Sequence, residues 1–277
     1  MSKNLLIYCV TNKDLNFLSK LEYKLAAVGK NKFSSGYINS DSLDNIFYKE
    51  EFYSELTFHY WFWKNELEKF INRDDLWIGF CQKRRFWLQN EKNDEVNFKN
   101  VNDHFLKEIP YEWKNYDAII CKPLKVEVNK ISKMIKRGWR NLIKDPTIFF
   151  NKKKQTIKLH FDMYHGYGLL DKAIERMNEK DRLKFKNFVN ISDTFNPHIM
   201  LISKPKVLKL WFQDLFEWLF ECEKIFNFKD LKNYETKRLF AYLAERYLSY
   251  WVKEYTRYKE WPYVFYDIER NLVEIKN

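Results

Sequence analysis

Short apolar runs alternate with longer amphipathic stretches along this chain. Four of the runs are bounded by polar residues and lie at Leu5–Val10, Leu76–Cys81, Tyr116–Cys121 and Ile199–Ile202. Short runs that are apolar at nearly every position are typical of strands covered on both faces of a sheet. The pattern therefore predicts a buried strand at each of these places.

The segments between the runs carry the spacing of amphipathic helices. Residues 46–71 and 160–188 have helical patterns, the first of them dense in aromatic residues. Two other segments carry a more regular stripe, with apolar residues three and four positions apart. These stripes predict helices over 208–222 and 236–253. Strands that alternate with helices predict an α/β fold built on a sheet.

Two segments lack a clear period. Residues 125–158 are basic and irregular, and we interpret them as a mobile or an inserted segment, which includes Lys152-Lys153-Lys154. Residues 255–277, around Pro262, are expected to form a C-terminal tail. No internal repeat is evident, and the length of 277 residues favours one large domain or two small ones.

Composition excludes several classes of protein. A hydrophobic content of 45% is enough to bury a core, which argues against disorder, and six Gly and six Pro exclude a collagen-like chain. The four cysteines are scattered, so a disulfide scaffold or a zinc site is not expected. The chain shows no signal-peptide pattern and no apolar run long enough to span a membrane, so a cytosolic location is expected.

The net charge of +11 points to phosphate-bearing partners. Nucleic acid, an anionic membrane surface and a nucleoside diphosphate would all suit a basic protein. A solvated surface with no such partner explains the same surplus equally well. The net charge by itself therefore does not distinguish among these partners, and the positions of individual Lys and Arg residues are more informative.

One cationic cluster follows a predicted strand directly. Lys83, Arg84 and Arg85 come after Leu76–Cys81, and ligands of open α/β sheets bind at the carboxyl ends of strands. Arg binds phosphate oxygens with two parallel hydrogen bonds, so this pair suits a diphosphate, although adjacent Arg residues are also common on surfaces. Thr11, Lys13 and Asp41 are expected where such a fold reads a nucleotide.

Two further side chains are candidates for acid–base chemistry. His165, near Asp162, suits a general base or an oriented ligand, and equally a structural histidine. Glu245 follows an apolar helical face that would raise its pKa towards that of a general base, or it forms an ion pair with Arg246 or Arg238. The phosphate-binding glycine motifs, the nucleophile elbow and an Asp-x-Asp metal motif are absent.

The motifs of residues 41–87, taken in order, resemble a known family. They are Asp41-Ser-Leu-Asp-Asn45, then Glu55-Leu-Thr with the aromatic run and Lys64-Asn65, then Gly79-Phe-Cys-Gln-Lys-Arg-Arg-Phe86. Asn196-Pro-His-Ile-Met200 and Arg238–Arg246 continue the match, which extends over about residues 5–250. The chain resembles a bacterial glycosyltransferase family of capsule and O-antigen clusters, of the DUF4422 type, which includes galactofuranosyltransferases.

The resemblance implies a GT-A-like fold, with a single mixed sheet flanked by helices, a helical C-terminal part and one domain over residues 1–277. It implies an inverting hexosyltransferase that uses a UDP-sugar, UDP-galactofuranose above all. Cations in place of the Asp-x-Asp motif imply that no metal cofactor is required. The family's His-Tyr is Gln82-Lys83 here, which affects the donor contacts.

The implied roles fall into three sets. Glu245 is the expected base, with His165 second. Asn196, His198, Arg238 and Arg246 are expected to contact the sugar or the acceptor. The residues expected to bind the donor and its diphosphate are Thr11, Lys13, Asp41, Asn45, Lys83, Arg84 and Arg85.

The expected partners are a UDP-sugar and a glycan or lipid-linked oligosaccharide acceptor, with the protein at the cytoplasmic face of the inner membrane. Nucleic acid is not expected as a partner. Two alternatives remain open from the sequence: a nucleic-acid-binding module that uses lysine charge and aromatic stacking, and a catalytically inactive relative that binds sugar nucleotides.

Overall fold

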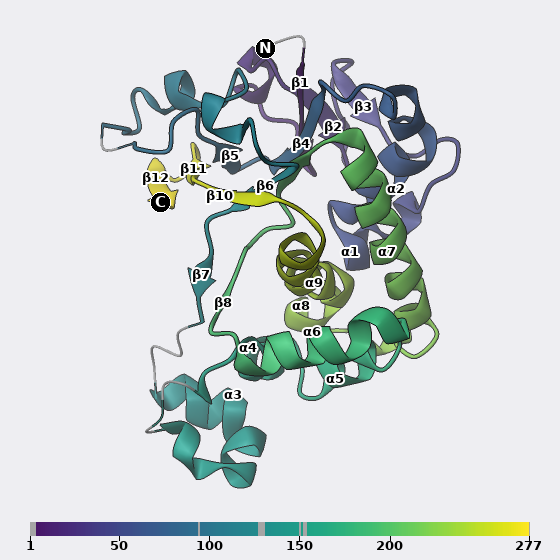
Figure 1. Cartoon of the computed structure of the whole chain (residues 1–277), viewed down its shortest axis with the longest axis vertical. Helices are drawn as coiled ribbons and strands as arrows, with labels where there is room; N and C mark the ends of the chain where they lie inside the picture. Colours follow the sequence, from purple (N-terminus) through teal and green to yellow (C-terminus); the bar gives the residue numbers. More distant parts are fainter. Residues whose placement is uncertain (1–3, 94, 127–130, 150, 152–153, 277) are drawn as a thin grey trace. The chain divides into compact units, whose positions relative to one another are not determined.

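Parallel pairing of β1 (Leu5–Thr11) with β4 (Trp77–Gln82) forms the centre of the main sheet (Figure 1). The structure is a computed structural model that describes residues 4–93, 95–126, 131–149, 151 and 154–276. These group into two compact units. The first unit takes in the described parts of Met1–Lys122, His198–Gln213 and Trp251–Asn277, and the second unit takes in those of Pro123–Pro197 and Asp214–Tyr250.

The main sheet belongs to the first unit and is mixed. Along its main path the strands lie in the order β10-β6-β9-β4-β1-β2-β3. β1, β2, β3 and β4 run parallel, whereas β9 is antiparallel to both β4 and β6. The bounds of the strands not yet given are β2 (Lys24–Ala27), β3 (Tyr37–Asn39), β6 (Ala118–Cys121), β9 (Leu201–Ser203) and β10 (Tyr258–Trp261).

The last residues of the chain join this sheet, where the sequence suggested a tail over 255–277. After β10, which pairs with β6, the chain forms β11 (Tyr263–Asp267) and β12 (Leu272–Lys276). β11 pairs with β12 on one side and with β5 (Arg85–Trp87) on the other, and all of these pairs except β10–β6 are antiparallel. Period-two alternation in segments this short is a weak signal, and the partner strands lie far away in sequence.

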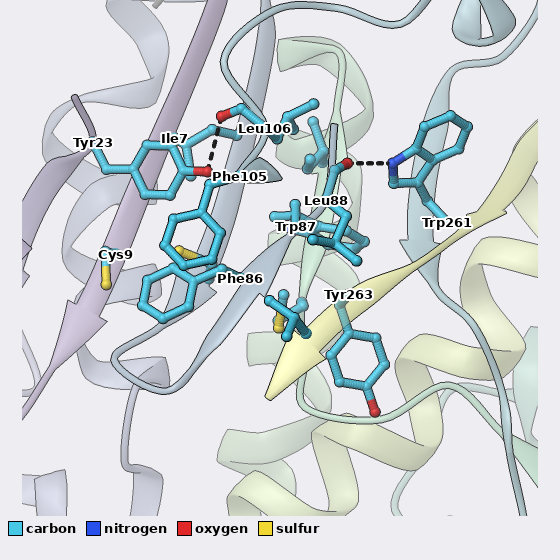
Figure 2. Close-up of a cluster of buried hydrophobic side chains, with 14 of the residues drawn as sticks. Ile7, Cys9, Tyr23, Phe86, Trp87, Leu88, Phe105, Leu106, Trp261 and Tyr263 are labelled. Carbon is cyan, nitrogen blue, oxygen red and sulfur yellow. Dashed lines mark hydrogen bonds between the residues drawn. The ribbon is translucent and has the colours of Figure 1, made fainter. Parts of the chain in front are cut away.

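Aromatic side chains pack on both faces of the sheet. Side chains alternate along a strand, so Tyr8 of β1 points away from Ile7 and contacts Phe58 and Phe62, at ring-centroid distances of 5.5 and 4.9 Å. On the other face a cluster that includes Ile7, Phe86 and Trp261 is fully buried. Two polar atoms in this cluster are satisfied by backbone carbonyls: Tyr23 Oη donates to Leu106 at 2.8 Å and Trp261 Nε1 to Leu88 at 2.7 Å (Figure 2).

The helical segment predicted over 46–71 is interrupted. It consists of η2 (Phe47–Lys49), α1 (Glu50–Tyr53), α2 (Leu56–Asn65) and η3 (Leu67–Phe70). The break between α1 and α2 falls at Ser54, which has a positive φ of 54°. The remaining short helices of the first unit are η1 (Leu18–Lys20), η4 (Val101–His104) and η5 (Tyr111–Trp113).

The second unit is mainly helical. The helical segment predicted over 160–188 divides into α4 (Ile157–Tyr164), α5 (Leu169–Ile174) and α6 (Glu179–Ile191). Gly166 and Gly168, both with positive φ, separate the first two. The unit also contains β7 (Leu124–Lys125) paired with β8 (Thr194–Phe195), and the helices α3 (Ile131–Lys144), η6 (Pro146–Phe149), η8 (Phe228–Asp230) and α8 (Tyr234–Lys237).

The two strongest helix predictions are confirmed. The apolar stripes give α7 (Pro205–Glu223) and α9 (Leu239–Tyr255). Within the second unit, two tyrosines of α9 bind a buried carboxylate, Asp181, which accepts hydrogen bonds from Tyr247 Oη at 2.9 Å and Tyr250 Oη at 3.0 Å. Two hydroxyl donors compensate for the water that this carboxylate loses on burial.

The irregular segment predicted over 125–158 contains a helix, α3, among its described residues. Residues 127–130, 150, 152 and 153 lie outside the described residues, and with them Lys152 and Lys153 of the basic run. The mobility suggested for this segment and the single domain over 1–277 stay predictions. Among the described residues, no helix combines the length and apolarity needed to cross a bilayer. All four cysteines are buried without a disulfide, as expected.

His59 makes the stability of the protein depend on pH. It lies in α2, 2% exposed, between the rings of Phe80 and Phe212, and burial lowers its pKa to about 3. An unfolded chain protonates His near pH 6.5, so this contribution is complete above that pH and is lost as the pH falls towards 3. Between about pH 7 and 5 the loss amounts to about 2 kcal/mol.

We expect His59→Phe to remove this dependence while keeping a ring in the core. Urea unfolding at both pH values should show that the variant loses about 2 kcal/mol less unfolding free energy than the wild type. His104→Phe, at a half-buried position, controls for the loss of a histidine. Equal losses in the wild type and His59→Phe would contradict the prediction.

Candidate functional site

Cations gather where β1 and β4 end. The two strands are parallel and in register, with Val10 opposite Gln82, so the residues after each strand emerge at the same edge of the sheet. Lys83 and Arg84 form the turn between β4 and β5, and Arg85 begins β5. Lys13 thus follows β1, and Lys83 and Arg84 follow β4, while their predicted role in binding a diphosphate stays a prediction.

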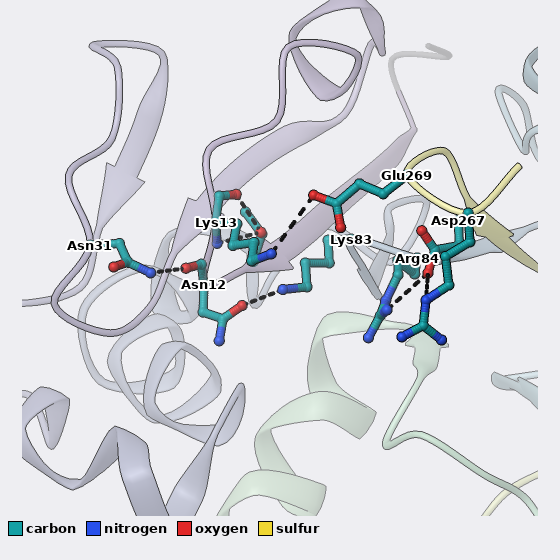
Figure 3. Close-up of polar contacts among 9 residues, drawn as sticks. Asn12, Lys13, Asn31, Lys83, Arg84, Asp267 and Glu269 are labelled. Atoms are coloured by element: carbon teal, nitrogen blue, oxygen red, sulfur yellow. Dashed lines mark hydrogen bonds and ion pairs between the residues drawn. The ribbon is translucent and has the colours of Figure 1, made fainter.

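A polar network orders this edge (Figure 3). Thr11 Oγ1 donates to the carbonyl of Lys13 at 2.7 Å and accepts from its N–H at 3.0 Å, which closes a turn directly after β1. Lys83 Nζ donates to Asn12 Oδ1, and Asn31 Nδ2 donates to the carbonyl of Asn12 at 2.6 Å. Asn12 thus joins the loop after β1 to the turn after β4.

Acidic residues from the end of the chain face the cations. Arg84 Nη1 donates to Asp267 Oδ2 at 2.9 Å, and Lys13 Nζ lies 3.7 Å from Glu269 Oε1 (Figure 3). Asp267 is 2% exposed in its side chain; burial opposes its ionisation, but the hydrogen bond and charge of Arg84, together with the backbone N–H and charge of Arg270, outweigh this and lower its pKa. Arg84 keeps other N–H donors, and its Nε has no hydrogen-bond partner among the described residues.

A small pocket opens between these groups. It has a volume of about 170 Å³ and combines three cations with apolar side chains and the acidic turn. Its lining residues are Lys13, Leu15, Phe17, Lys83, Arg84, Tyr266, Asp267, Ile268 and Glu269. The cations present several N–H donors to an anion placed there, in competition with Asp267 and Glu269.

A larger pocket of about 410 Å³ lies beside β2 and β3. It offers two aromatic rings, amides and one carboxylate, in the residues Ala27, Gly29, Lys30, Asn31, Phe33, Asn39, Asp41 and Phe47. Asn31 lines this pocket and reaches, through Asn12, to Lys83 in the smaller one. A ligand with a planar ring and polar hydroxyl groups suits such a lining.

Asp41 and Asn45 have different surroundings. Asp41 lines the larger pocket, as its predicted role requires. Asn45 is not among the lining residues: its Oδ1 accepts from the N–H of Phe47 at 3.1 Å and its Nδ2 donates to the carbonyl of Leu43 at 2.9 Å. These local bonds arrange the chain before η2.

Gln82 connects separate parts of the sequence motifs. Its Nε2 donates to Glu55 Oε1 and, at 2.9 Å, to the carbonyl of His198, and its Oε1 accepts from Arg85 Nη1 at 3.1 Å. His198 Nε2 lies 3.2 Å from Tyr263 Oη, and its backbone has a positive φ of 75°. One glutamine therefore ties the Glu55-Leu-Thr motif to Arg85 and to the segment around His198.

In the second unit, Glu245 is paired with a buried arginine. Arg246 Nη1 donates to Glu245 Oε2, its guanidinium lies 3.7 Å from the centre of the Phe195 ring, and only 1% of its side chain is exposed. Arg246 Nη2 and His160 Nδ1 are 3.3 Å apart. Burial and the charge of Arg246 lower the pKa of His160 to about 3, so at neutral pH its Nδ1 accepts this bond.

The other predicted residues of the second unit are held by nearby groups. His165 directly follows α4 and stacks on Tyr242, with ring centres 3.7 Å apart. Asn196 is buried, and its backbone N–H donates to Ser249 Oγ at 2.8 Å. Arg238 follows α8 directly, and its carbonyl accepts from the N–H of Tyr242.

Sequence reasoning grouped the cations correctly and missed their partners. Asp267 and Glu269 were not predicted, because acidic residues close together occur at several places in the chain and nothing local marks these two. Asn12, Asn31 and His160 carried no signal, because polar residues of this kind are common in loops and helices. Among the described residues, no cluster of three or more His, Cys, Asp or Glu side chains is placed to hold a metal ion.

Comparison with known proteins agrees with this fold. A family model described as "Domain of unknown function (DUF4422)" matches residues 6–257. Among solved structures, the apo structure of WbbM, a bifunctional glycosyltransferase, has a TM-score of 0.70 and 22% identity, over 96% of this chain and 46% of that one. A search of curated proteins finds no match.

The chain spans about half the length of that solved protein, and at this identity the likeness establishes the fold. The predicted mixed α/β fold, with a large central sheet and helices on it, is confirmed and is shared with a glycosyltransferase. Since the family model covers most of the sequence, the chain belongs to the DUF4422 family.

Proposed function

We propose that this protein is a glycosyltransferase that takes a sugar from a nucleoside-diphosphate donor. The observation that carries the proposal is a pair of pockets, one lined by cations at the carboxyl edge of the sheet and one lined by rings and polar groups, with Lys83 of the first and Asn31 of the second both hydrogen-bonded to Asn12. A diphosphate suits the first and a nucleoside the second. The fold shared with WbbM, titled a bifunctional glycosyltransferase, supports the same reading.

The reaction requires two kinds of help from the protein. A bond forms between an acceptor hydroxyl oxygen and C1 of the sugar, while the bond from C1 to the diphosphate oxygen breaks and its electron pair leaves with the diphosphate. Negative charge grows on the leaving group, and the hydroxyl proton passes to a base. Fixed cations stabilise the first change and a carboxylate accepts the proton.

The donor side of the proposal rests on the first unit. Lys13, Lys83 and Arg84 line the smaller pocket and would hold the diphosphate, and Asp41 in the larger pocket would contact the ribose. Thr11 shapes the turn that presents Lys13. Arg85 contacts Gln82 and would act from the neighbouring strand.

The choice of UDP, and of galactofuranose as the sugar, follows from the family resemblance. The base we propose is Glu245, held by Arg246, with His165 as the second candidate and inversion as the stereochemical outcome. Asn196, His198 and Arg238 are proposed sugar or acceptor contacts. A glycan or lipid-linked acceptor of surface polysaccharide synthesis, met at the cytoplasmic face of the inner membrane, completes the proposal.

Selective nucleotide binding tests the donor site. UDP should raise the melting temperature of the wild type more than GDP, CMP or dTDP, because a ligand of the folded state stabilises it. Arg84→Gln should weaken UDP binding and reduce transfer by about 2–4 kcal/mol of transition-state stabilisation.

Arg270→Gln is the matched control. Arg270 is 73% exposed, lies 3.8 Å from the same carboxylate of Asp267, and does not line the pocket. Arg270→Gln removes one positive charge near Asp267, as Arg84→Gln does, but it leaves the lining of the pocket unchanged. Only Arg84→Gln should therefore weaken UDP binding. If Arg84→Gln fails to fold, Lys83→Gln tests UDP binding in the same pocket. Unchanged UDP binding in the folded pocket variants would exclude this diphosphate site.

Metal dependence tests what neutralises the leaving group. Lys and Arg side chains occupy the strand end that would otherwise carry acidic metal ligands. They donate hydrogen bonds to phosphate oxygens and do not bind metal ions. We therefore expect EDTA to leave turnover unchanged. Loss of turnover with EDTA, restored by added Mn²⁺ or Mg²⁺, would contradict cationic replacement of the metal.

The proposed base is tested by Glu245→Gln. The amide keeps the size of the side chain and cannot accept a proton, so the rate of transfer should fall by about 10²–10⁴-fold while UDP still binds. Glu254→Gln, at an exposed position of the same helix, controls for the change of charge and should retain activity. Full activity in a folded Glu245→Gln protein would rule the assignment out.

A further inference from the structure

Helix α3 (Ile131–Lys144) of the second unit is both basic and apolar. Its 14 residues, ISKMIKRGWRNLIK, contain three Lys, two Arg and no acidic residue. Two large apolar side chains of this helix lie on its outside: Trp139 is 50% exposed and Ile143 is 72% exposed. They stand four positions apart, which places them one above the other on the same face of the helix.

The neighbouring side of the helix is already packed. Gly138 is buried, and a Cβ atom at this position would come within 3.3 Å of Met163 in α4. Leu142 packs against the small core formed by Ile148, Leu159 and Met163. The core of the second unit therefore uses one part of the apolar surface of α3 and leaves Trp139 and Ile143 uncovered within the described structure.

Cations lie directly beside the exposed apolar pair. The guanidinium of Arg140 is 5.2 Å from the centre of the Trp139 ring and 5.5 Å from that of Tyr167. Lys144 Nζ is 5.3 Å from the centre of the same Tyr167 ring. The nearest acidic residue in sequence, Asp145, is bonded to Lys154 at 2.5 Å. The face thus presents aromatic and aliphatic groups flanked by positive charge.

We infer that this face of α3, defined by Trp139, Arg140, Ile143 and Lys144, binds the surface of an anionic lipid bilayer. A helix that combines exposed Trp and aliphatic residues with Lys and Arg lies in the interfacial plane, with its apolar groups among the upper acyl chains and its cations near the headgroups. Charge alone would also suit nucleic acid, but Ile143 has no favourable place on a phosphate backbone.

The advantage that membrane binding gives to this protein rests on the proposed function. A transferase whose acceptor is anchored in lipid gains from being held at the membrane, where the acceptor is concentrated. Anionic headgroups supply the charge complementarity, since each Lys or Arg near such a surface contributes about 1 kcal/mol of attraction. Binding to lipid needs neither donor nor acceptor, so it can be measured independently of transfer.

The test is flotation of the purified protein with vesicles. The wild type should float with mixed phosphatidylcholine–phosphatidylglycerol vesicles and not with phosphatidylcholine alone. Trp139→Ala/Ile143→Ser and Arg140→Glu/Lys144→Glu should each weaken flotation by roughly tenfold or more. UDP binding should be unchanged in both, which shows that the fold and the donor site are intact and separates failure of this inference from failure of the proposed function.

Two matched controls accompany these variants. Leu183→Ser removes an apolar side chain that is 75% exposed on α6, and Lys20→Glu/Lys24→Glu makes the same change of charge at exposed positions of the first unit. Both should float like the wild type. Flotation that ignores phosphatidylglycerol, or that survives both α3 substitutions, overturns the inference. Binding to single-stranded RNA without binding to vesicles also overturns it, in favour of a nucleic-acid surface.

Discussion

Positive charge concentrated at one edge of the sheet is the constraint on which the first unit depends. Parallel pairing of β1 and β4 brings Lys13, Lys83 and Arg84 to the same edge. Like charges at such a place repel, and the repulsion grows where water is excluded. Asp267 and Glu269, delivered by the end of the chain, offset it. This requirement gives a physical reason for the last strands to close back on β5.

The same contacts prepare the edge for a ligand. Asp267 is nearly inaccessible to water and takes one N–H of Arg84, which fixes the direction of the guanidinium before any anion arrives. Glu269 contacts Lys13 at the surface, where an ion pair contributes little, so a diphosphate can displace it at small cost. A fixed arginine and an easily displaced carboxylate together suit a site that binds and releases a charged product.

The second unit contains a buried positive charge, and its neighbours compensate for it in a different way. Arg246 is enclosed by Glu245, His160 and the ring of Phe195, so its charge is matched by one carboxylate, one neutral acceptor and one π face. Removing one partner from such a group leaves a buried charge without compensation, which is more costly than the loss of a surface pair. The carboxylate of Glu245 is thereby held in one position, in the ion pair with Arg246 that the sequence offered as the alternative to a free general base.

The sequence by itself determined the central strands, the two long helices and the place of the cations. Each of these depends on local information: an apolar run, a stripe of period 3.6, or a charged cluster directly after a strand, as at Lys83–Arg85. The family was also recognisable from the order of its motifs. The tertiary structure decided what the local pattern does not contain. Pairing over long sequence distances made strands of residues 258–276, and it brought Asp267 to Arg84, Gln82 to Glu55 and Asn31 to Asn12. Such contacts have no sequence period, because they depend on how the sheet closes and not on the residues that lie next to them in the chain.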